Sequence, residues 1–370
     1  MSKKTLFLTF RIFSAMGGIE RVCRIFGKSL YEMQDHKEAN VSIYSMYDTA
    51  DQIDERYFPS SIFKAFGVGR NRFVMESIRK GIKSDIVIIS HINLLPVAFA
   101  IKLCSPKTKL VLVAHGIEVW KRFNFIKRIM LGRFDVILPV SRFTGNKLAR
   151  LNGLPEKRFT VLNNCLDPFL LPAVHGPKDD VLMKRYGFKE EDIVLMTITR
   201  LSSKEKYKNC DKVLETMQRL SVECPQLKYL LVGAYDIEEK IRIEKISSEM
   251  GLGGSVVITG FIPDVEFPLH YNIADIFIML SEREGFGIVF IEAMYYGKPV
   301  IGADNGGIAD ALANGKLGIL ANPLDAREVA RAIKAIVSDK AKYTPDRTTV
   351  SELFGYETYN NKLERIIAAL

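Results

Sequence analysis

Two glutamates, Glu284 and Glu292, lie eight positions apart in this 370-residue chain, and a Gly-Phe-Gly turn at residues 285–287 directly follows the first. Residues 276–280 are a short apolar run without alternation, which predicts a buried parallel strand, and residues 288–296 predict the helix after it. Glu284 is therefore expected where a parallel strand ends, at the edge of an open sheet where ligands bind. Glycine N–H groups at a helix N-terminus suit a diphosphate, so the segment predicts a site for a phosphorylated ligand.

Basic side chains follow another predicted strand, residues 193–199. Arg200 comes directly after it, and Lys206 and Lys208 follow a few residues later. A guanidinium fork and a mobile ammonium group can bind adjacent phosphates and stabilise charge on a leaving group. Lysines in a loop are also common as plain solvated surface, so the charges alone do not decide the matter.

Two further candidate sites lie in the first half of the chain. Gly17 and Gly18 follow the first predicted strand and open a helix, where the backbone can approach a phosphate or a sugar closely. His115 ends the apolar run 110–114, and its imidazole can donate a hydrogen bond to a sugar hydroxyl without adding a fixed charge. The chain has neither the G-x-G-x-x-G dinucleotide fingerprint nor a P-loop.

Short apolar runs that alternate with helical patterns must position these residues. Such alternation predicts parallel sheets with helices on both faces, in two successive sets separated by the Pro- and Gly-rich stretch 167–178. The closing segment 354–370 predicts an amphipathic helix. Strands are predicted at 5–10, 41–46, 86–90, 110–114, 136–140 and 160–163 in the first half, and at 193–199, 229–232, 256–259, 276–280, 299–302 and 318–320 in the second.

From Glu284 to Ile301 the chain resembles the signature E-G-F-G-x-x-x-x-E-A-x-x-x-G-x-P-V-I of glycosyltransferase family 4, a large family of retaining enzymes. The resemblance implies the GT-B fold, an α/β architecture in which the parallel sheets of two Rossmann-like domains face each other across a deep cleft. The implied domains are an acceptor-binding domain over 1–167 and a donor-binding domain over 178–353. The helix at 354–370 would cross back to the first domain.

Other segments match the family in the expected order. Residues 17–21 resemble its Gly-Gly-x-Glu-Arg loop, His115-Gly116 its His-Gly pair, and residues 164–167 its Asn-Gly-Val-Asp turn with Cys165 in the glycine position. The segment 200–209 resembles G-R-L-x-x-x-K-G, with an insertion and with Thr199 and Asn209 where the pattern has glycine. Residues 305–307 match a Gly-Gly turn near the donor sugar.

The resemblance also implies roles for individual residues. Glu284 would hold the donor sugar, Glu292 would accept hydrogen bonds from the ribose, and Arg200 with Lys208 (preferred over Lys206) would neutralise the diphosphate. The implied catalytic set is Glu284, His115, Arg200 and Lys208, and the implied donor-binding set is Gly17, Gly18, Gly260, Phe261, Gly285, Phe286, Gly287, Ile288 and Glu292. No metal-ligand cluster is evident, so we expect a metal-independent enzyme with a nucleotide-diphosphate sugar as substrate and no cofactor.

Charge and cysteine content bear on location and partners. Residues 1–160 hold 27 Lys and Arg against 13 Asp and Glu, whereas residues 161–370 hold 25 against 30. The basic first half suggests an anionic partner. The five cysteines lack metal-ligand or redox spacing and are expected to be reduced, buried thiols of a cytosolic protein. No apolar run is long enough to span a membrane.

The sequence indicates the acceptor substrate less directly than the donor. The segment 120–133 interleaves basic and large apolar residues and predicts either a peripheral contact with an anionic membrane, made by Phe123, Phe125, Ile126 and Ile129, or an ordinary core-packed helix with a basic outer face. The first alternative implies a lipid-linked saccharide acceptor at the cytoplasmic leaflet, as in bacterial surface-polysaccharide assembly.

Two other classes of function remain open at this point. One is a different GT-B enzyme, such as a sugar-nucleotide epimerase or an inverting transferase. The other is a non-catalytic module that binds an anionic ligand. No nucleic-acid partner is expected, because no nucleic-acid-binding signature accompanies the basic half.

Overall fold

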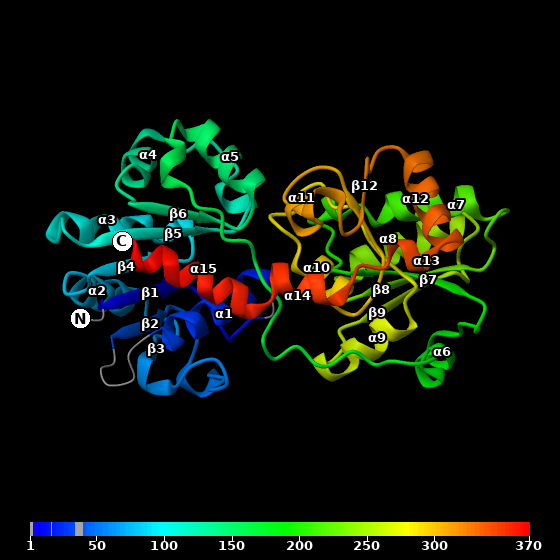
Figure 1. Cartoon of the computed structure of the whole chain (residues 1–370), viewed down its shortest axis with the longest axis horizontal. Coiled ribbons are helices and arrows are strands. Elements are labelled where there is room, and N and C mark those ends of the chain that lie inside the picture. Colours follow the sequence, from blue (N-terminus) through cyan, green and yellow to red (C-terminus); the bar gives the residue numbers. More distant parts are fainter. Residues whose placement is uncertain (1–2, 16, 34–39) are drawn as a thin grey trace. The chain divides into compact units, whose positions relative to one another are not determined.

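The protein is described by a computed structural model that covers residues 3–15, 17–33 and 40–370. Within these residues the chain forms two compact units (Figure 1). Unit 1 comprises residues 1–168 and 356–370, and unit 2 comprises residues 169–355. No helix of the described residues is both long and apolar enough to cross a membrane.

Unit 1 is built on a sheet of six parallel strands in the order β3-β2-β1-β4-β5-β6. The central strands are apolar and fully buried on both faces, as expected of a parallel sheet between helices. The elements of unit 1 are β1 (Thr5–Thr9), α1 (Gly18–Glu32), β2 (Val41–Ser45), β3 (Phe63–Ala65), α2 (Arg70–Gly81), β4 (Ile86–Ile89), α3 (Leu95–Cys104), β5 (Lys109–Ala114), α4 (Phe125–Leu131), β6 (Val136–Pro139), α5 (Arg142–Asn152) and α15 (Tyr356–Ala368).

Unit 2 repeats the architecture with the strand order β12-β11-β10-β7-β8-β9, again all parallel. Its core lies between the sheet and helices such as α7 and α12, which pack on each other. The elements of unit 2 are α6 (Asp180–Tyr186), β7 (Ile193–Ile198), α7 (Cys210–Leu220), β8 (Leu227–Val232), α8 (Ile237–Glu249), β9 (Val256–Gly260), α9 (Phe267–Ile273), β10 (Ile276–Met279), α10 (Ile288–Tyr295), β11 (Val300–Ala303), α11 (Ile308–Ala311), β12 (Ile319–Ala321), α12 (Ala326–Ser338), α13 (Lys340–Tyr343) and α14 (Arg347–Phe354).

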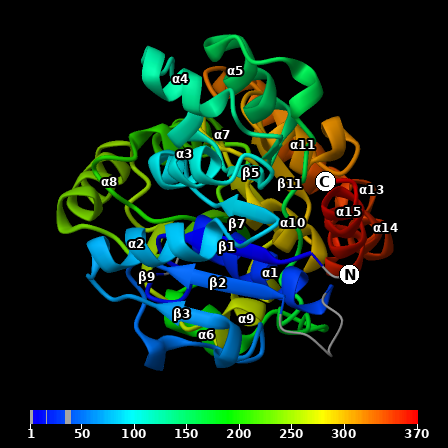
Figure 2. The same ribbon diagram turned by 90° about the vertical axis from the view of Figure 1, so that its left-hand side faces the viewer.

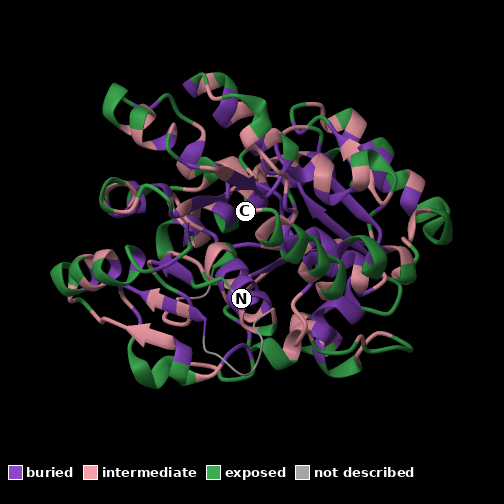
Figure 3. Cartoon of the chain, turned by 60° about the vertical axis from the view of Figure 1, so that its left-hand side comes forward, coloured by how far each residue is buried: buried purple, intermediate pink, exposed green. Residues whose placement is uncertain are grey.

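Both sheets therefore confirm the predicted α/β class with two sets of parallel strands. Figure 3 shows most strands as buried, while the helices alternate buried and exposed faces, as amphipathic helices on a sheet must. All six strands predicted for the second half exist. The last helix, α15, packs against α1 of unit 1 (Figure 1).

Three predictions about the first half were wrong. Residues 160–163 form no strand: Thr160 and Leu162 donate single hydrogen bonds to β6, and one isolated bridge joins Phe159 to Ile137. The three-residue edge strand β3 was missed, because it is only half-buried and too short to show a pattern. Cys104 is exposed at the end of α3, whereas the other four cysteines are buried; all five are free.

Candidate functional site

The strand order of unit 2 fixes where its ligand edge lies. The chain moves from β7 through β8 to β9 on one side, then returns to place β10 directly beside β7. The neighbouring strands β7 and β10 therefore form a topological switch point, where the strand order reverses. The loops that follow the two strands flank the crevice in which such sheets usually bind ligands. These two loops carry Arg200, Lys208 and Glu284.

Lys208 and Glu284 meet at this switch point. The Nζ of Lys208 lies 2.9 Å from Oε2 of Glu284, and both side chains are about four-fifths buried, with 19% and 20% of their surface exposed. Burial of the ammonium group works to lower the pKa of Lys208, but the Glu284 carboxylate outweighs burial and holds the pKa above its usual value. Lys208 is therefore a fixed positive charge at the ligand edge.

Arg200 is also paired, but at the surface. Its guanidinium forms an ion pair with Glu205, and 69% of the Arg200 side chain is exposed against 18% of Glu205. Glu205 was not predicted as part of the site, because nothing in the sequence marks one glutamate within a charged loop. A small pocket on this loop is lined in part by Arg200, Glu205 and Lys208.

The backbone around Glu284 depends on glycines. Gly307 donates its N–H to the Glu284 carbonyl at 2.8 Å, and Gly306 has φ +76° with its α-carbon packed so closely that an added Cβ would lie 3.0 Å from the same carbonyl oxygen. Gly287 has φ +89°, and a Cβ there would meet the Phe290 ring at 2.6 Å. The turn at 305–307, predicted to lie near the donor sugar, therefore supports the backbone of Glu284 directly.

The other predicted residues of unit 2 divide into buried and exposed. Gly285, Phe286 and Ile288 are buried, and Glu292 on α10 is only 5% exposed. Phe286 packs edge-on against Phe354 of α14, with ring centroids 5.8 Å apart. At the end of β9, Gly260 is buried with φ +76°, whereas Phe261 is 60% exposed.

Asn209 explains a departure from the family pattern. It adopts the left-handed conformation, with φ +57° and ψ +36°, at the start of α7, and its side-chain amide donates to the Leu280 carbonyl at 2.9 Å. Glycine adopts this conformation at least cost and asparagine is the next most tolerant residue. Asparagine can therefore take the left-handed conformation at this position without a glycine.

Tyr207 joins the two loops and was not predicted. Its carbonyl accepts a hydrogen bond from the N–H of Glu282 at 2.9 Å. Its ring lies 5.6 Å from the Lys208 ammonium and 5.7 Å from the Arg283 guanidinium, within cation–π range. An aromatic residue next to the lysine was the only available sequence signal.

His115 in unit 1 directly follows β5 and is buried. Its Nε2 lies 2.9 Å from the carbonyl oxygen of Ser90, at the end of the neighbouring strand β4, and its backbone N–H donates to the Glu118 carboxylate at 2.6 Å. Burial lowers the pKa of His115 despite the opposing effect of Glu118, so the ring is neutral near pH 7. With Nε2–H donating to Ser90, the ring offers Nδ1 as an acceptor, in contrast to the donor role that we expected.

Gly17 and Gly18 also lie in unit 1, at the start of α1 after β1. A Cβ on Gly18 would have nothing within 4 Å, and one on Gly17 would meet only the flexible end of Glu20. The packing of unit 1 therefore does not itself demand glycine at these two positions. Asp167, in the predicted turn at 164–167, accepts a hydrogen bond from the Tyr57 hydroxyl at 2.6 Å, a structural contact.

The predicted residues thus divide between the units. Unit 1 holds Gly17, Gly18 and His115, and unit 2 holds the remainder. Within unit 2 the structure brings Lys208 and Glu284 into contact and places the 305–307 turn against Glu284. Among the described residues, no group of three or more His, Cys, Asp or Glu side chains is placed to hold a metal ion.

Family comparisons match both halves of the chain. Residues 16–168 match the Glycosyltransferase Family 4 model, and residues 178–349 match the model described as glycosyl transferases group 1.

Several curated proteins are similar over part of their length. The GDP-mannose-dependent alpha-(1-6)-phosphatidylinositol monomannoside mannosyltransferase of Mycolicibacterium smegmatis is 27% identical over 62% of this chain and 61% of its own length. The 2-deoxystreptamine glucosyltransferase of Streptomyces kanamyceticus is 27% identical over 58% of this chain and 54% of its own. The chain therefore spans between half and two thirds of these relatives.

Solved structures show the same fold over the whole chain. Anabaena HepE in complex with UDP has a TM-score of 0.81 at 20% identity and covers 99% of this chain and 100% of its own. A glycosyltransferase from Rickettsia africae has a TM-score of 0.79 at 18% identity, covering 99% and 98%. At this level of identity the likeness establishes a fold shared with glycosyltransferases, two Rossmann-like units with parallel sheets.

Proposed function

We propose that this chain, which pairs a Glycosyltransferase Family 4 domain with a glycosyl transferases group 1 domain, is a retaining glycosyltransferase. It transfers a sugar from a UDP- or GDP-linked donor to a saccharide or lipid-linked saccharide acceptor, in the assembly of a bacterial surface glycan. The single observation that carries the proposal is the Lys208–Glu284 pair at the switch point of unit 2, in which Glu284 is the first residue of the segment with the Glu-x7-Glu spacing.

The site chemistry follows from these charges. Lys208 stays protonated and Arg200 carries a permanent charge, so both neutralise the diphosphate as the glycosidic bond breaks. N–H groups of the Gly285–Gly287 turn bind the same phosphates at the start of α10. Glu284 holds the donor sugar and Glu292 accepts hydrogen bonds from the ribose. This electrostatic mechanism requires no metal ion.

The comparisons support transfer from a nucleotide sugar and leave two candidate bases for the donor, uracil and guanine. The M. smegmatis relative is described as GDP-mannose-dependent, whereas the HepE structures contain UDP or UDP-glucose. A thermal-shift panel of UDP, GDP, ADP and their sugar conjugates separates them, since a ligand of the native state raises the melting temperature. We expect one base to give a shift that disappears in Glu292→Ala. No shift with any nucleotide would refute the proposal and favour a non-catalytic anion-binding module.

Turnover measurements separate the roles of the carboxylates. Glu292→Ala should chiefly weaken donor binding, whereas Glu284→Ala and Lys208→Ala should chiefly lower kcat. NMR analysis of the product anomer tests retention, and activity after treatment with EDTA tests independence of metal. Release of nucleoside diphosphate without acceptor, or an inverted product, would move the enzyme to another class.

A peripheral membrane contact is the second part of the proposal. The short helix α4 exposes Phe125 and Ile126, with 75% and 62% of their surfaces accessible, together with Ile129. Figures 1 and 2 show α4 and α5 next to each other, and Figure 1 shows them beside edge strand β6 of unit 1. The same segment of sequence carries the basic residues Lys121, Arg122, Lys127, Arg128 and Arg133. Exposed apolar side chains in a basic segment suit an anionic bilayer.

One predicted membrane contact was wrong. Phe123 is buried, and its N–H donates to the Asn152 side chain at 2.9 Å, so this ring packs in the core of unit 1. Flotation with vesicles of phosphatidylcholine, with and without phosphatidylglycerol, tests the surface. The double variant Phe125→Ser/Ile126→Ser should lose binding to the anionic vesicles, whereas Val222→Ser, an exposed apolar residue of unit 2, should keep it. Equal flotation of the two variants would remove the membrane from the proposal.

A further inference from the structure

Arg200, one of the two cations proposed to bind the diphosphate, already has a carboxylate partner in the loop that carries it. Glu205 is the more buried member of this ion pair, with 18% of its side chain exposed against 69% for Arg200. The backbone fixes the position of Glu205: its N–H donates to Ser202 at 2.8 Å, and its carbonyl accepts from the N–H of Lys208 at 2.9 Å. The carboxylate is therefore held in place by the same turn that leads to Lys208.

Glu205 and Glu284 lie in different segments of the sequence. Glu284 lies in the Glu-x7-Glu segment, whereas Glu205 lies in the insertion that separates Arg200 from Lys208 in this chain. Each of the two cations thus has a carboxylate partner.

We propose that Glu205 sets the donor affinity of this enzyme and its dependence on phosphate number, by competing with the diphosphate for Arg200. This inference rests on the proposed function, because it takes Arg200 as a diphosphate ligand. Arg200 is largely exposed, so water and salt screen the charges around it, and the effect of Glu205 on a dianion bound there amounts to a few-fold in affinity.

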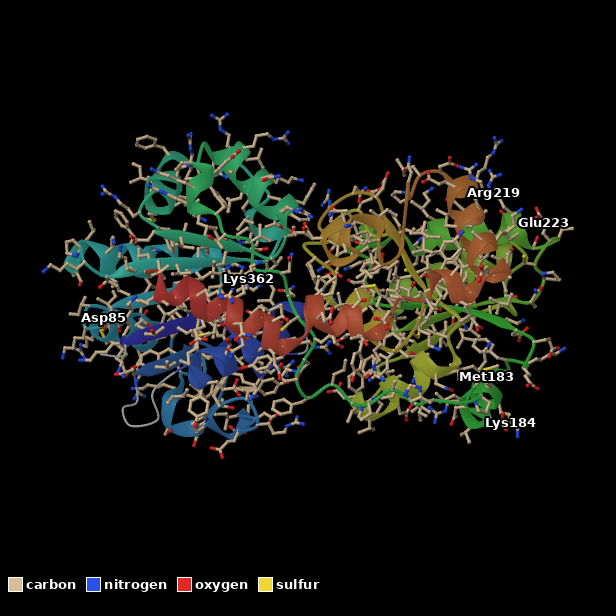
Figure 4. The ribbon with its side chains drawn as sticks, in the orientation of Figure 1. Asp85, Met183, Lys184, Arg219, Glu223 and Lys362 are labelled. Carbon is tan, nitrogen blue, oxygen red and sulfur yellow. The ribbon has the colours of Figure 1, made fainter. Side chains whose placement is uncertain are left out.

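The matched pair of variants is Glu205→Gln and Glu223→Gln. Glutamine keeps an oxygen that accepts a hydrogen bond from Arg200 and removes only the charge. Glu223 has an ion pair of its own, with Lys334 at 2.9 Å, and lies past the end of α7, the helix whose first turn follows Asn209. Figure 4 labels Glu223 at this outer end of unit 2. Both variants change the net charge equally, so only position distinguishes them.

Isothermal titration with UDP, UMP and uridine, and with GDP, GMP and guanosine, tests the inference. We expect Glu205→Gln to lower the Kd for the nucleoside diphosphate by roughly threefold or more at low salt, the monophosphate by less, and the nucleoside not at all. Raising the salt concentration should reduce the gain. Glu223→Gln should match the wild-type protein.

Three results would overturn the inference. An unchanged or raised Kd of Glu205→Gln for the diphosphate, in a wild-type protein that binds it, would show that Glu205 does not compete. An equal gain for the nucleoside would locate the effect away from the phosphates. Absence of binding by the wild-type protein to every nucleotide would instead remove the proposed function, and this inference with it.

Discussion

The Lys208–Glu284 pair allows a quantitative test of the site in unit 2. Unit charges 2.9 Å apart attract by about 6 kcal/mol at an effective dielectric constant of about 20. Loss of hydration by two side chains that are largely buried offsets most of this attraction. We therefore expect Lys208→Met and Glu284→Gln each to destabilise unit 2 by about 2 kcal/mol. Lys208→Met leaves the Glu284 carboxylate without its cation, and Glu284→Gln leaves the Lys208 ammonium group without its anion. The double variant should also lose about 2 kcal/mol, and not the sum of about 4.

The assay must report on unit 2 alone, since a chain of two units need not unfold in one step. Hydrogen exchange of peptides that contain β7 and β10, at increasing urea concentration, gives the local free energy of unfolding. Additivity of the two single variants to within about 0.5 kcal/mol would refute the ion pair as a stabilising interaction. The raised pKa of Lys208 supplies a second check. The contribution should be complete below the unfolded-state pKa of about 10.4 and should be lost only as the pH rises through the higher folded-state value.

Three other predictions follow from the same unit. Burial, reinforced by Lys340 and opposed by Asp275, lowers the pKa of Lys298 to about 8. Between pH 8 and about 10.4 the unfolded chain binds a proton that the folded protein does not, so stability should rise with pH by up to about 3 kcal/mol, and Lys298→Met should flatten this rise in urea titrations at pH 8 and 10. Asn209→Ala should cost roughly 1 kcal/mol more than Asn209→Gly, the reverse of the order inside helices, because φ is positive there; equal urea midpoints would contradict the left-handed conformation. Gly306→Ala should lower kcat with donor Kd little changed, because the added Cβ displaces the Glu284 backbone, and wild-type turnover would show that this support is dispensable.

The strands were predictable where burial was complete. The runs at 86–89 and 276–280 have no polar position because both faces of a parallel strand are covered, and both became central strands. The segment 160–163 also contains apolar residues, but it lies beside β6 with only two backbone hydrogen bonds, from Thr160 to Ile137 and from Leu162 to Pro139. Composition alone does not distinguish a paired strand from an extended segment that makes only a few backbone hydrogen bonds. The edge strand β3 was missed for a different reason, since a half-buried strand of three residues shows almost no hydrophobic pattern in the sequence.

The position of the site in unit 2 was predictable, because the ends of the parallel strands determine it. Strand ends mark the ligand edge, and the return of the chain to place β10 beside β7 brings Lys208 to Glu284 across 76 positions of sequence. Partners within a loop were not predictable. Glu205 is one of many acidic residues, and only the turn around it shows that it faces Arg200. The tautomer of His115 likewise depends on a backbone carbonyl of a neighbouring strand, which no side-chain pattern encodes.

The position of α15 has a consequence for the order in which the protein is completed during synthesis. Tyr359 and Leu363 of this helix are buried in unit 1, where Asn360 accepts a hydrogen bond from Ser29 of α1 at 2.5 Å. Unit 1 begins with β1 but lacks this cover until residues 356–370 have been made, whereas every residue of unit 2 is translated before α15. At about 5–20 residues per second, unit 1 waits roughly 10 to 40 seconds with that face of α1 uncovered. The unit that is translated first is therefore the last to be completed.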